Sequence, residues 1–174
     1  LACANCAKRA VKAAIEKLAP AAEEHPGEWK ALRFAIVPDA PNSNYNGTTY
    51  IDTMSYKAVY KFIDMTHEEY KRRCGDRLGK SIKGIFTDEP QYYRWGTVWS
   101  DKMPAEFEAA YGYNVLDYLP ALFIDFDGDK EFRYDYWKLC HKLFINHWIK
   151  PVYDWCEENG IAYEMCLYKR KGTA

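Results

Sequence analysis

The feature that most constrains the fold is the run Gly-Ile-Phe-Thr-Asp-Glu-Pro at residues 84–90, where apolar residues stop abruptly at two carboxylates and a proline. Glycine and proline bracket residues that favour β-structure, so the run predicts one buried strand. Pro90 has no N–H and ends the pairing. Regular alternation would place Thr87 and Glu89 on one face and Asp88 on the other. Glu89 is therefore expected at the strand's C-terminal tip, where parallel-sheet enzymes keep their chemistry.

Two further strands and several helices are predicted along the chain. Apolar runs suggest strands at 32–37 and 161–166. The helical spacing of apolar residues suggests helices at 10–18, 55–74 and 104–110. A long helix is also expected, which begins between residues 125 and 129 and ends at 159. Alternating helices and strands are typical of βαβ units with a parallel sheet. A closed (β/α) barrel needs about 250 residues, whereas this chain has 174. We therefore expect an α/β fold, an incomplete TIM-barrel-like fragment with about three parallel strands and flanking helices; a small open sheet is the alternative.

The composition indicates one globular domain over residues 1–174, with irregular tails at 1–9 and 168–174. Hydrophobic residues make up 48% of the chain, enough for a core. The 24 basic and 25 acidic residues nearly cancel, so there is no bulk field to attract nucleic acid or an anionic membrane. No apolar stretch approaches the length of a membrane span. We expect neither nucleic acid nor membrane as a partner.

The cysteines bear on the cellular compartment. The six cysteines are dispersed along the chain: Cys3, Cys6, Cys74, Cys140, Cys156 and Cys166. Three of them fall in apolar helical or strand-like patterns. Dispersed, buried thiols favour a reducing compartment over a disulfide framework. We therefore expect a cytoplasmic protein, or a periplasmic or secreted one if a signal peptide was removed.

Two patterns that resemble metal sites are each incomplete. The Cys-x-x-Cys at Cys3 and Cys6 lacks the second pair that zinc requires. Asp125, Asp127 and Asp129 have the spacing of a calcium loop, but neither the turn glycine nor the acid at the twelfth position is present. Acids at a helix N-terminus explain them better, because the helix dipole favours negative charge there. We predict no metal ligands from these patterns.

The chain resembles large bacterial glycoside hydrolases related to the α-L-rhamnosidases of glycoside hydrolase family 106. The similarity extends from about Leu18 to Tyr163. Four motifs carry the resemblance, at residues 50–54, 66–70, 84–90 and 111–113. The most specific of them is Phe-Thr-Asp-Glu-Pro, within 84–90. It implies a barrel enzyme that cleaves complex glycans with a pair of acidic residues. Calcium dependence is also implied, although the residues themselves predict no cofactor. The chain is far shorter than family members, and Asp88 stands where the large retaining-glycosidase clan has asparagine before Glu-Pro.

Acidic residues near the predicted strand ends are the catalytic candidates. With the resemblance, Glu89 is expected to be the general acid and Glu164 its partner, because glycoside hydrolysis needs two carboxyl groups. A structural ion pair is the alternative for Glu89, and an outward-facing position is the alternative for Glu164. Asp39, Asp52 and Asp88 are candidate substrate-binding residues, although turn or loop capping explains each of them as well.

Loops near the same strand ends carry amide and aromatic side chains suited to sugars. The candidate substrate-binding residues in them are Asn44, Tyr45, Tyr92 and Trp95. Flat rings with a polar tip can stack on sugars, whereas packing of the loops over the sheet is the alternative.

The predicted function is a portion of a glycoside hydrolase catalytic domain, inactive as an isolated chain, with a carbohydrate as its substrate. The alternative is a carbohydrate-binding or assembly module without catalysis. Exposed sheet edges would also favour self-association into a homo-oligomer.

Overall fold

The computed structural model describes residues 32–37, 40–41, 43–92 and 97–166. The chain separates into two compact units, Leu1–Ala35 and Ile36–Ala174, where the sequence predicts one domain. Only 32–35 of the first unit are described, and the predicted helix at 10–18 lies outside the described residues. All the helices and strands below belong to the second unit.

Two parallel strands form the sheet. Strands β1 (Gly84–Asp88) and β2 (Ala162–Cys166) pair in register, with Gly84 opposite Ala162 and Asp88 opposite Cys166. A Cβ on Gly84 would lie 2.7 Å from the carbonyl oxygen of Ala162, so only glycine allows this close approach.

The prediction of a strand at 32–37 is wrong. Residues 32–37 are exposed and have no regular secondary structure, so the described sheet has two strands rather than about three. An apolar run marks a candidate strand, but hydrogen-bonded pairing with a neighbour decides whether one forms. A TIM barrel is accordingly not seen within the described residues.

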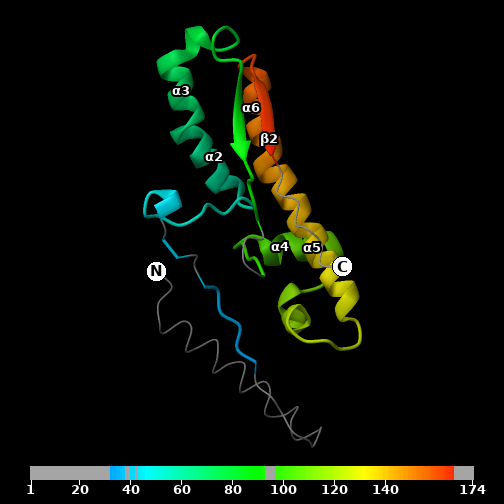
Figure 1. The fold of residues 1–174 in the computed structure, drawn as a ribbon. Helices are drawn as coiled ribbons and strands as arrows, with labels where there is room; N and C mark the ends of the chain where they lie inside the picture. Colours follow the sequence, from blue (N-terminus) through cyan, green and yellow to red (C-terminus); the bar gives the residue numbers. More distant parts are fainter. Residues whose placement is uncertain (1–31, 38–39, 42, 93–96, 167–174) are drawn as a thin grey trace, which may run out of the picture. The chain divides into compact units, whose positions relative to one another are not determined.

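One long helix packs behind the sheet (Figure 1). It consists of α5 (Asp129–Phe144), the π-helical segment η4 (Ile145–Ile149) and α6 (Lys150–Glu158). Pro151 explains the π-helical segment, because in a regular α-helix its ring would clash with the carbonyl four residues earlier. The helix ends where the sequence predicts, before Gly160, which has a left-handed φ of 66°.

The predicted helix from Ser55 to Cys74 forms as two helices, α2 (Tyr56–Met65) and α3 (His67–Cys74). The Ser55 side chain accepts a hydrogen bond from the Ala58 N–H, which confirms it as the N-cap. The break falls at Thr66, whose hydroxyl donates to the Phe62 carbonyl at 2.6 Å. Such bonding back to the preceding turn often bends helices.

The remaining elements are short. They are η1 (Ser43–Tyr45), η2 (Gly75–Arg77), α4 (Met103–Tyr111), with Pro104 in its first turn as predicted, and η3 (Val115–Leu122). No helix among the described residues is long and apolar enough to cross a membrane.

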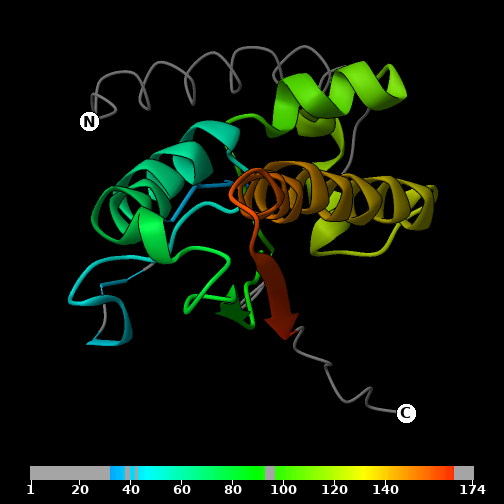
Figure 2. The same cartoon turned by 90° about the horizontal axis from the view of Figure 1, so that it is seen from above.

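Two apolar clusters stabilise the second unit. In one, Phe107 of α4 packs against Phe132 and Tyr136 of α5. In the other, residues of α2, η4 and α6 pack together and reach the sheet through Ile85 and Tyr163. Helices thus cover one sheet face, and the two strands lie together on one side of the long helix (Figure 2).

The opposite sheet face is uncovered by the described residues. Phe86, in the middle of β1, is 58% exposed. An exposed aromatic residue on a two-stranded sheet with open edges favours association. Self-association of the chain therefore stays a prediction.

The four described cysteines are free. Burial raises the pKa of Cys140 to about 12 and that of Cys156 to about 11. These two match the expectation of buried thiols, whereas Cys166 is exposed at the end of β2. Cys3 and Cys6 lie outside the described residues.

Candidate functional site

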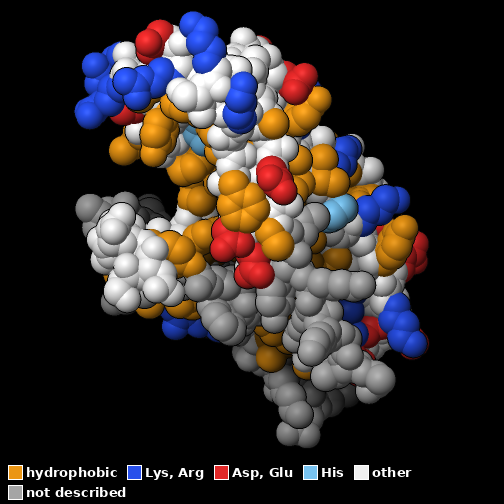
Figure 3. Space-filling model, turned by 45° about the horizontal axis from the view of Figure 1, so that its top comes forward, with side chains coloured by type: hydrophobic (Ala, Val, Ile, Leu, Met, Phe, Trp, Pro, Cys, Tyr) orange, Lys and Arg blue, Asp and Glu red, His pale blue; other side chains and the backbone are white. Residues whose placement is uncertain are grey.

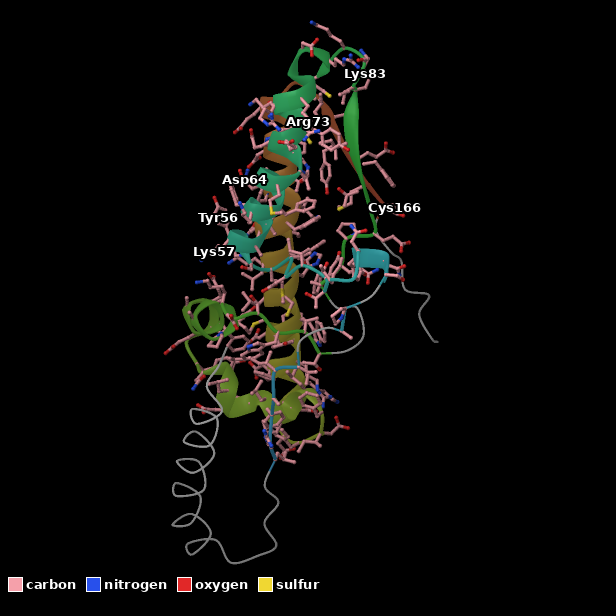
Figure 4. The ribbon with its side chains drawn as sticks, turned by 90° about the vertical axis from the view of Figure 1, so that its left-hand side faces the viewer. Tyr56, Lys57, Asp64, Arg73, Lys83 and Cys166 are labelled. Carbon is pink, nitrogen blue, oxygen red and sulfur yellow. The ribbon has the colours of Figure 1, made fainter. Side chains whose placement is uncertain are left out.

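Both strands end at a small polar cluster. Asp88 and Cys166 are paired as the last residues of β1 and β2, and the Glu89 N–H donates to the Cys166 carbonyl at 3.0 Å. A carboxylate oxygen of Asp88, one of Glu89 and the Cys166 sulfur all lie within 4.8 Å of one another, and all three residues are exposed. Figure 4 labels Cys166 near this end of the sheet and Lys83 at the other. Figure 3 shows acidic side chains beside exposed hydrophobic ones on one face.

The backbone of Glu89 is left-handed, with φ at 42°. The expected alternation, which would separate Glu89 from Asp88, is therefore wrong: the turn brings the two carboxylates together. A left-handed conformation costs a residue other than glycine about 1–2 kcal/mol. Strain of this kind is found disproportionately at functional sites, where surrounding contacts maintain it.

Replacing Glu89 by glycine is expected to stabilise the chain by about 1 kcal/mol, because glycine adopts a positive φ without the steric cost. Urea unfolding measures this change, with Glu89→Gln as the matched control that keeps the side-chain size and the strain. Equal unfolding free energies for the two variants would contradict the strained conformation.

Glu164 is not at the strand tip where the sequence predicts it. It is the middle residue of β2, exposed and opposite Phe86, which places it about 7 Å along the strand from Cys166. It shares the uncovered face with Asp88 and Cys166 by alternation. The predicted strand at 161–166 ends at Cys166, but sequence reasoning did not count this cysteine among the site residues.

The predicted amide and aromatic loop is tied to this end of the sheet. Asn44 and Tyr45 form part of η1, and the Tyr45 ring packs against the Tyr50 ring with centroids 5.1 Å apart. The Tyr50 hydroxyl in turn accepts a hydrogen bond from the Gln91 N–H at 3.0 Å. The structure thus links this loop to a residue two positions beyond Glu89.

Asp52 and Tyr92 both make contacts within the folded chain. The Asp52 carboxylate accepts hydrogen bonds from the Met54 N–H at 3.0 Å and the Ser100 hydroxyl at 2.8 Å. The Tyr92 ring packs against Phe144 with centroids 5.2 Å apart and touches both core clusters. The other two substrate-binding candidates, Asp39 and Trp95, lie outside the described residues.

The strand-tip cluster does not fit calcium by itself. Calcium takes six to eight oxygen ligands, whereas Asp88, Glu89 and Cys166 offer two carboxylates and a soft sulfur. Exposed acidic groups of this kind are common without an ion.

Two of the three aspartates at 125–129 pair with one arginine. The Arg133 guanidinium donates to the carbonyls of Ala121 and Ile124, and it pairs with Asp125 at 2.7 Å and Asp129 at 3.1 Å. An internal cation thus bridges the two acids. Of the two, Asp129 is the first residue of α5, as the interpretation as an acid at a helix N-terminus expects, whereas Asp125 lies before the helix.

Comparisons with known proteins agree with the motifs at this site. Residues 17–168 match glycoside hydrolase family 106, described as alpha-L-rhamnosidase. A protein of Formosa agariphila named "Putative beta-glucuronidase" is 27% identical over 154 residues, which are 82% of this chain and 13% of that protein. A rhamnosidase structure from Novosphingobium sp. PP1Y matches with a TM-score of 0.55 and 23% identity, over 67% of this chain and 12% of that one.

These matches differ in what they establish. The structural match shows similarity of fold alone, and this chain spans only a small share of both proteins, 13% and 12%. The family match covers most of the chain and includes the 84–90 run that ends at the site. The chain therefore belongs to glycoside hydrolase family 106, the alpha-L-rhamnosidase family.

Proposed function

We propose that this chain forms part of a glycoside hydrolase catalytic domain, in which Glu89 is the general acid. One observation carries the proposal: Glu89 has a strained, left-handed backbone at the C-terminal end of a parallel strand, with its carboxyl group exposed. Barrel enzymes place their reacting groups at this end of the strands. The family assignment supports the same chemistry.

Glycoside hydrolysis needs one carboxyl group to protonate the leaving oxygen and a second as nucleophile or water-activating base. Glu89 is suited to the first role because no ion pair involving its carboxylate is found among the described residues. Glu164 is the proposed second group, since it lies on the uncovered face of the neighbouring strand. A carboxylate from outside this chain is the alternative for that role.

Sugar binding is proposed for the residues beside the acid. Asp88 offers a carboxylate next to Glu89, and η1 brings the Asn44 amide and the Tyr45 ring toward the same end of the sheet through Tyr50. Rings and amides of this kind stack on sugars and hydrogen-bond their hydroxyl groups. Asp52 and Tyr92 take structural roles in this proposal.

The chain alone is expected to show no turnover, because barrel catalysis draws residues from several strand ends and the described sheet has two strands. The measurement is release of the aryl group from an aryl α-L-rhamnoside and an aryl β-glucuronide, with the complete catalytic domain as the positive control. Rapid hydrolysis by the 174-residue chain itself would contradict this expectation.

Carbohydrate binding without catalysis is the second candidate, favoured by the η1 loop that carries Asn44 and Tyr45. Calorimetric titration with oligosaccharides separates the two roles when combined with the hydrolysis assay. Binding without cleavage by the complete domain would favour this second role.

A further inference from the structure

Two side chains hold the backbone just beyond Glu89. The Tyr50 hydroxyl accepts a hydrogen bond from the Gln91 N–H at 3.0 Å, and the Thr53 hydroxyl donates to the Gln91 carbonyl at 2.8 Å. Both backbone groups of Gln91 are thus bound by one segment that lies about 40 positions earlier, at separations of 41 and 38 residues. On the other side, the Glu89 N–H is bound to the Cys166 carbonyl.

The peptide between these anchors needs such support. Glu89 is left-handed, and it precedes Pro90, whose ring pushes the preceding residue toward extended conformations. Its conformation is therefore disfavoured both by its own Cβ and by the following proline. Contacts elsewhere must maintain it, and Pro90, although buried, has no N–H to contribute.

The segment that holds Gln91 is itself held by two residues from elsewhere in the chain and by one hydrogen bond within the segment. Asp52 binds the Met54 N–H and the Ser100 hydroxyl through its two carboxylate oxygens. The Met54 carbonyl accepts a hydrogen bond at 2.7 Å from Nδ1 of His147, which lies in the π-helical segment. Thr53 is only 2% exposed, so its hydroxyl has little freedom to bind elsewhere.

We infer that Tyr50 and Thr53 are positioning residues that hold Gln91 so that Glu89 keeps its left-handed backbone and its carboxyl group stays at the strand tip. The catalytic consequence rests on the proposed role of Glu89, whereas the conformational consequence does not. The two can therefore be tested separately.

The conformational test is amide hydrogen exchange of the full chain, followed residue by residue. Thr53→Val removes the hydroxyl at nearly constant shape, Thr53→Ser keeps it, and Tyr50→Phe removes the other contact. A lost hydrogen bond of about 1.4 kcal/mol corresponds to roughly tenfold faster exchange. We expect that increase at Glu89 and Gln91 in Thr53→Val and Tyr50→Phe, and wild-type exchange in Thr53→Ser.

Thr66→Val is the matched control, because it also removes a hydroxyl that bonds to a backbone carbonyl, in the helical layer. It should leave exchange at Glu89 and Gln91 unchanged. Unchanged exchange there in both Thr53→Val and Tyr50→Phe would overturn the inference. Equal acceleration in Thr53→Ser and Thr53→Val would also overturn it; if Thr53→Val does not fold, Tyr50→Phe and Thr53→Ser decide the matter.

The catalytic test uses the complete catalytic domain. Thr53→Val should lower kcat about tenfold with KM unchanged, and Thr53→Ser should restore it, because only the placement of the acid has changed. If Glu89→Gln leaves turnover intact, the proposed function fails, and exchange alone judges the positioning. If Glu89→Gln abolishes turnover while Thr53→Val and Tyr50→Phe both leave kcat and exchange unchanged, the positioning inference alone fails.

Discussion

Replacing Glu89 by glutamine in the complete catalytic domain is expected to lower glycoside turnover by about 10²–10⁴-fold, the usual contribution of a general acid. Glutamine keeps the size and the hydrogen-bonding reach of the side chain but has no proton to give to the leaving oxygen. The backbone should be unaffected, because glutamine accepts the same left-handed conformation at a similar cost. The loss should therefore be seen in kcat rather than in the free energy of unfolding.

The leaving group makes this experiment specific. An aryl group that departs readily as its anion needs little protonation, so Glu89→Gln should slow its release far less than that of a poor leaving group. Glu108→Gln, at an exposed carboxylate of α4, is the matched control and should behave as wild type with both substrates. Undiminished turnover of the substrate with the poor leaving group in Glu89→Gln would remove Glu89 from the mechanism.

Replacing Arg133 by methionine is expected to lower the free energy of unfolding by about 3 kcal/mol, the lower end for breaking a buried ion pair. The arginine side chain is 32% exposed, but that of its partner Asp129 is only 8% exposed and would be left without the pairing cation. The carbonyls of Ala121 and Ile124 would also lose their donor. Urea unfolding at neutral pH measures the change.

Arg133→Lys separates charge from geometry. Lysine restores a positive charge but not the planar fork that reaches several acceptors, so it should recover only part of the loss. Equal stability of the methionine variant and wild type would contradict the role of Arg133 in organising this turn.

The interaction of Arg133 with Asp125 should make the free energy of unfolding depend on pH. Hydrogen bonding and charge from Arg133 hold the pKa of Asp125 below its ordinary value of 3.8. A lowered pKa in the folded state means that this contribution is present above the ordinary aspartate pKa and is lost as the pH falls through the lowered value. Below about pH 4, the difference in free energy of unfolding between wild type and Arg133→Met should therefore become smaller.

Local sequence signals predicted the two observed strands and several helix ends, although the helix expected at 55–74 forms as two helices and the one expected at 10–18 lies outside the described residues. Ser55 caps its helix, Pro104 lies in the first turn of α4, and the long helix ends before Gly160 because each depends on contacts within a few residues. The same signals proposed a strand at 32–37, which has no regular secondary structure. Pairing, which a local pattern does not contain, distinguishes such a run from a true strand.

The candidate site was predictable only in part. The sequence identified Glu89 and Asp88 because two carboxylates follow an apolar run, and the range matched by the family includes this run. It could not predict that Glu89 turns into a left-handed conformation, because steric preferences argue against it both for glutamate and before proline. It also placed Glu164 at a tip that β2 reaches two residues later, at Cys166.

What the sequence determined by itself is the two strands, the caps and ends of several helices, the two acids at and just after the end of β1, and the family. Only the tertiary structure decided the register that sets Asp88 beside Cys166, the helices that cover one face of the sheet, and the hold of Tyr50 and Thr53 on Gln91. The physical reason is separation along the chain. A cap or a turn depends on neighbours within about four residues, whereas register and distant hydrogen bonds depend on how the whole unit packs.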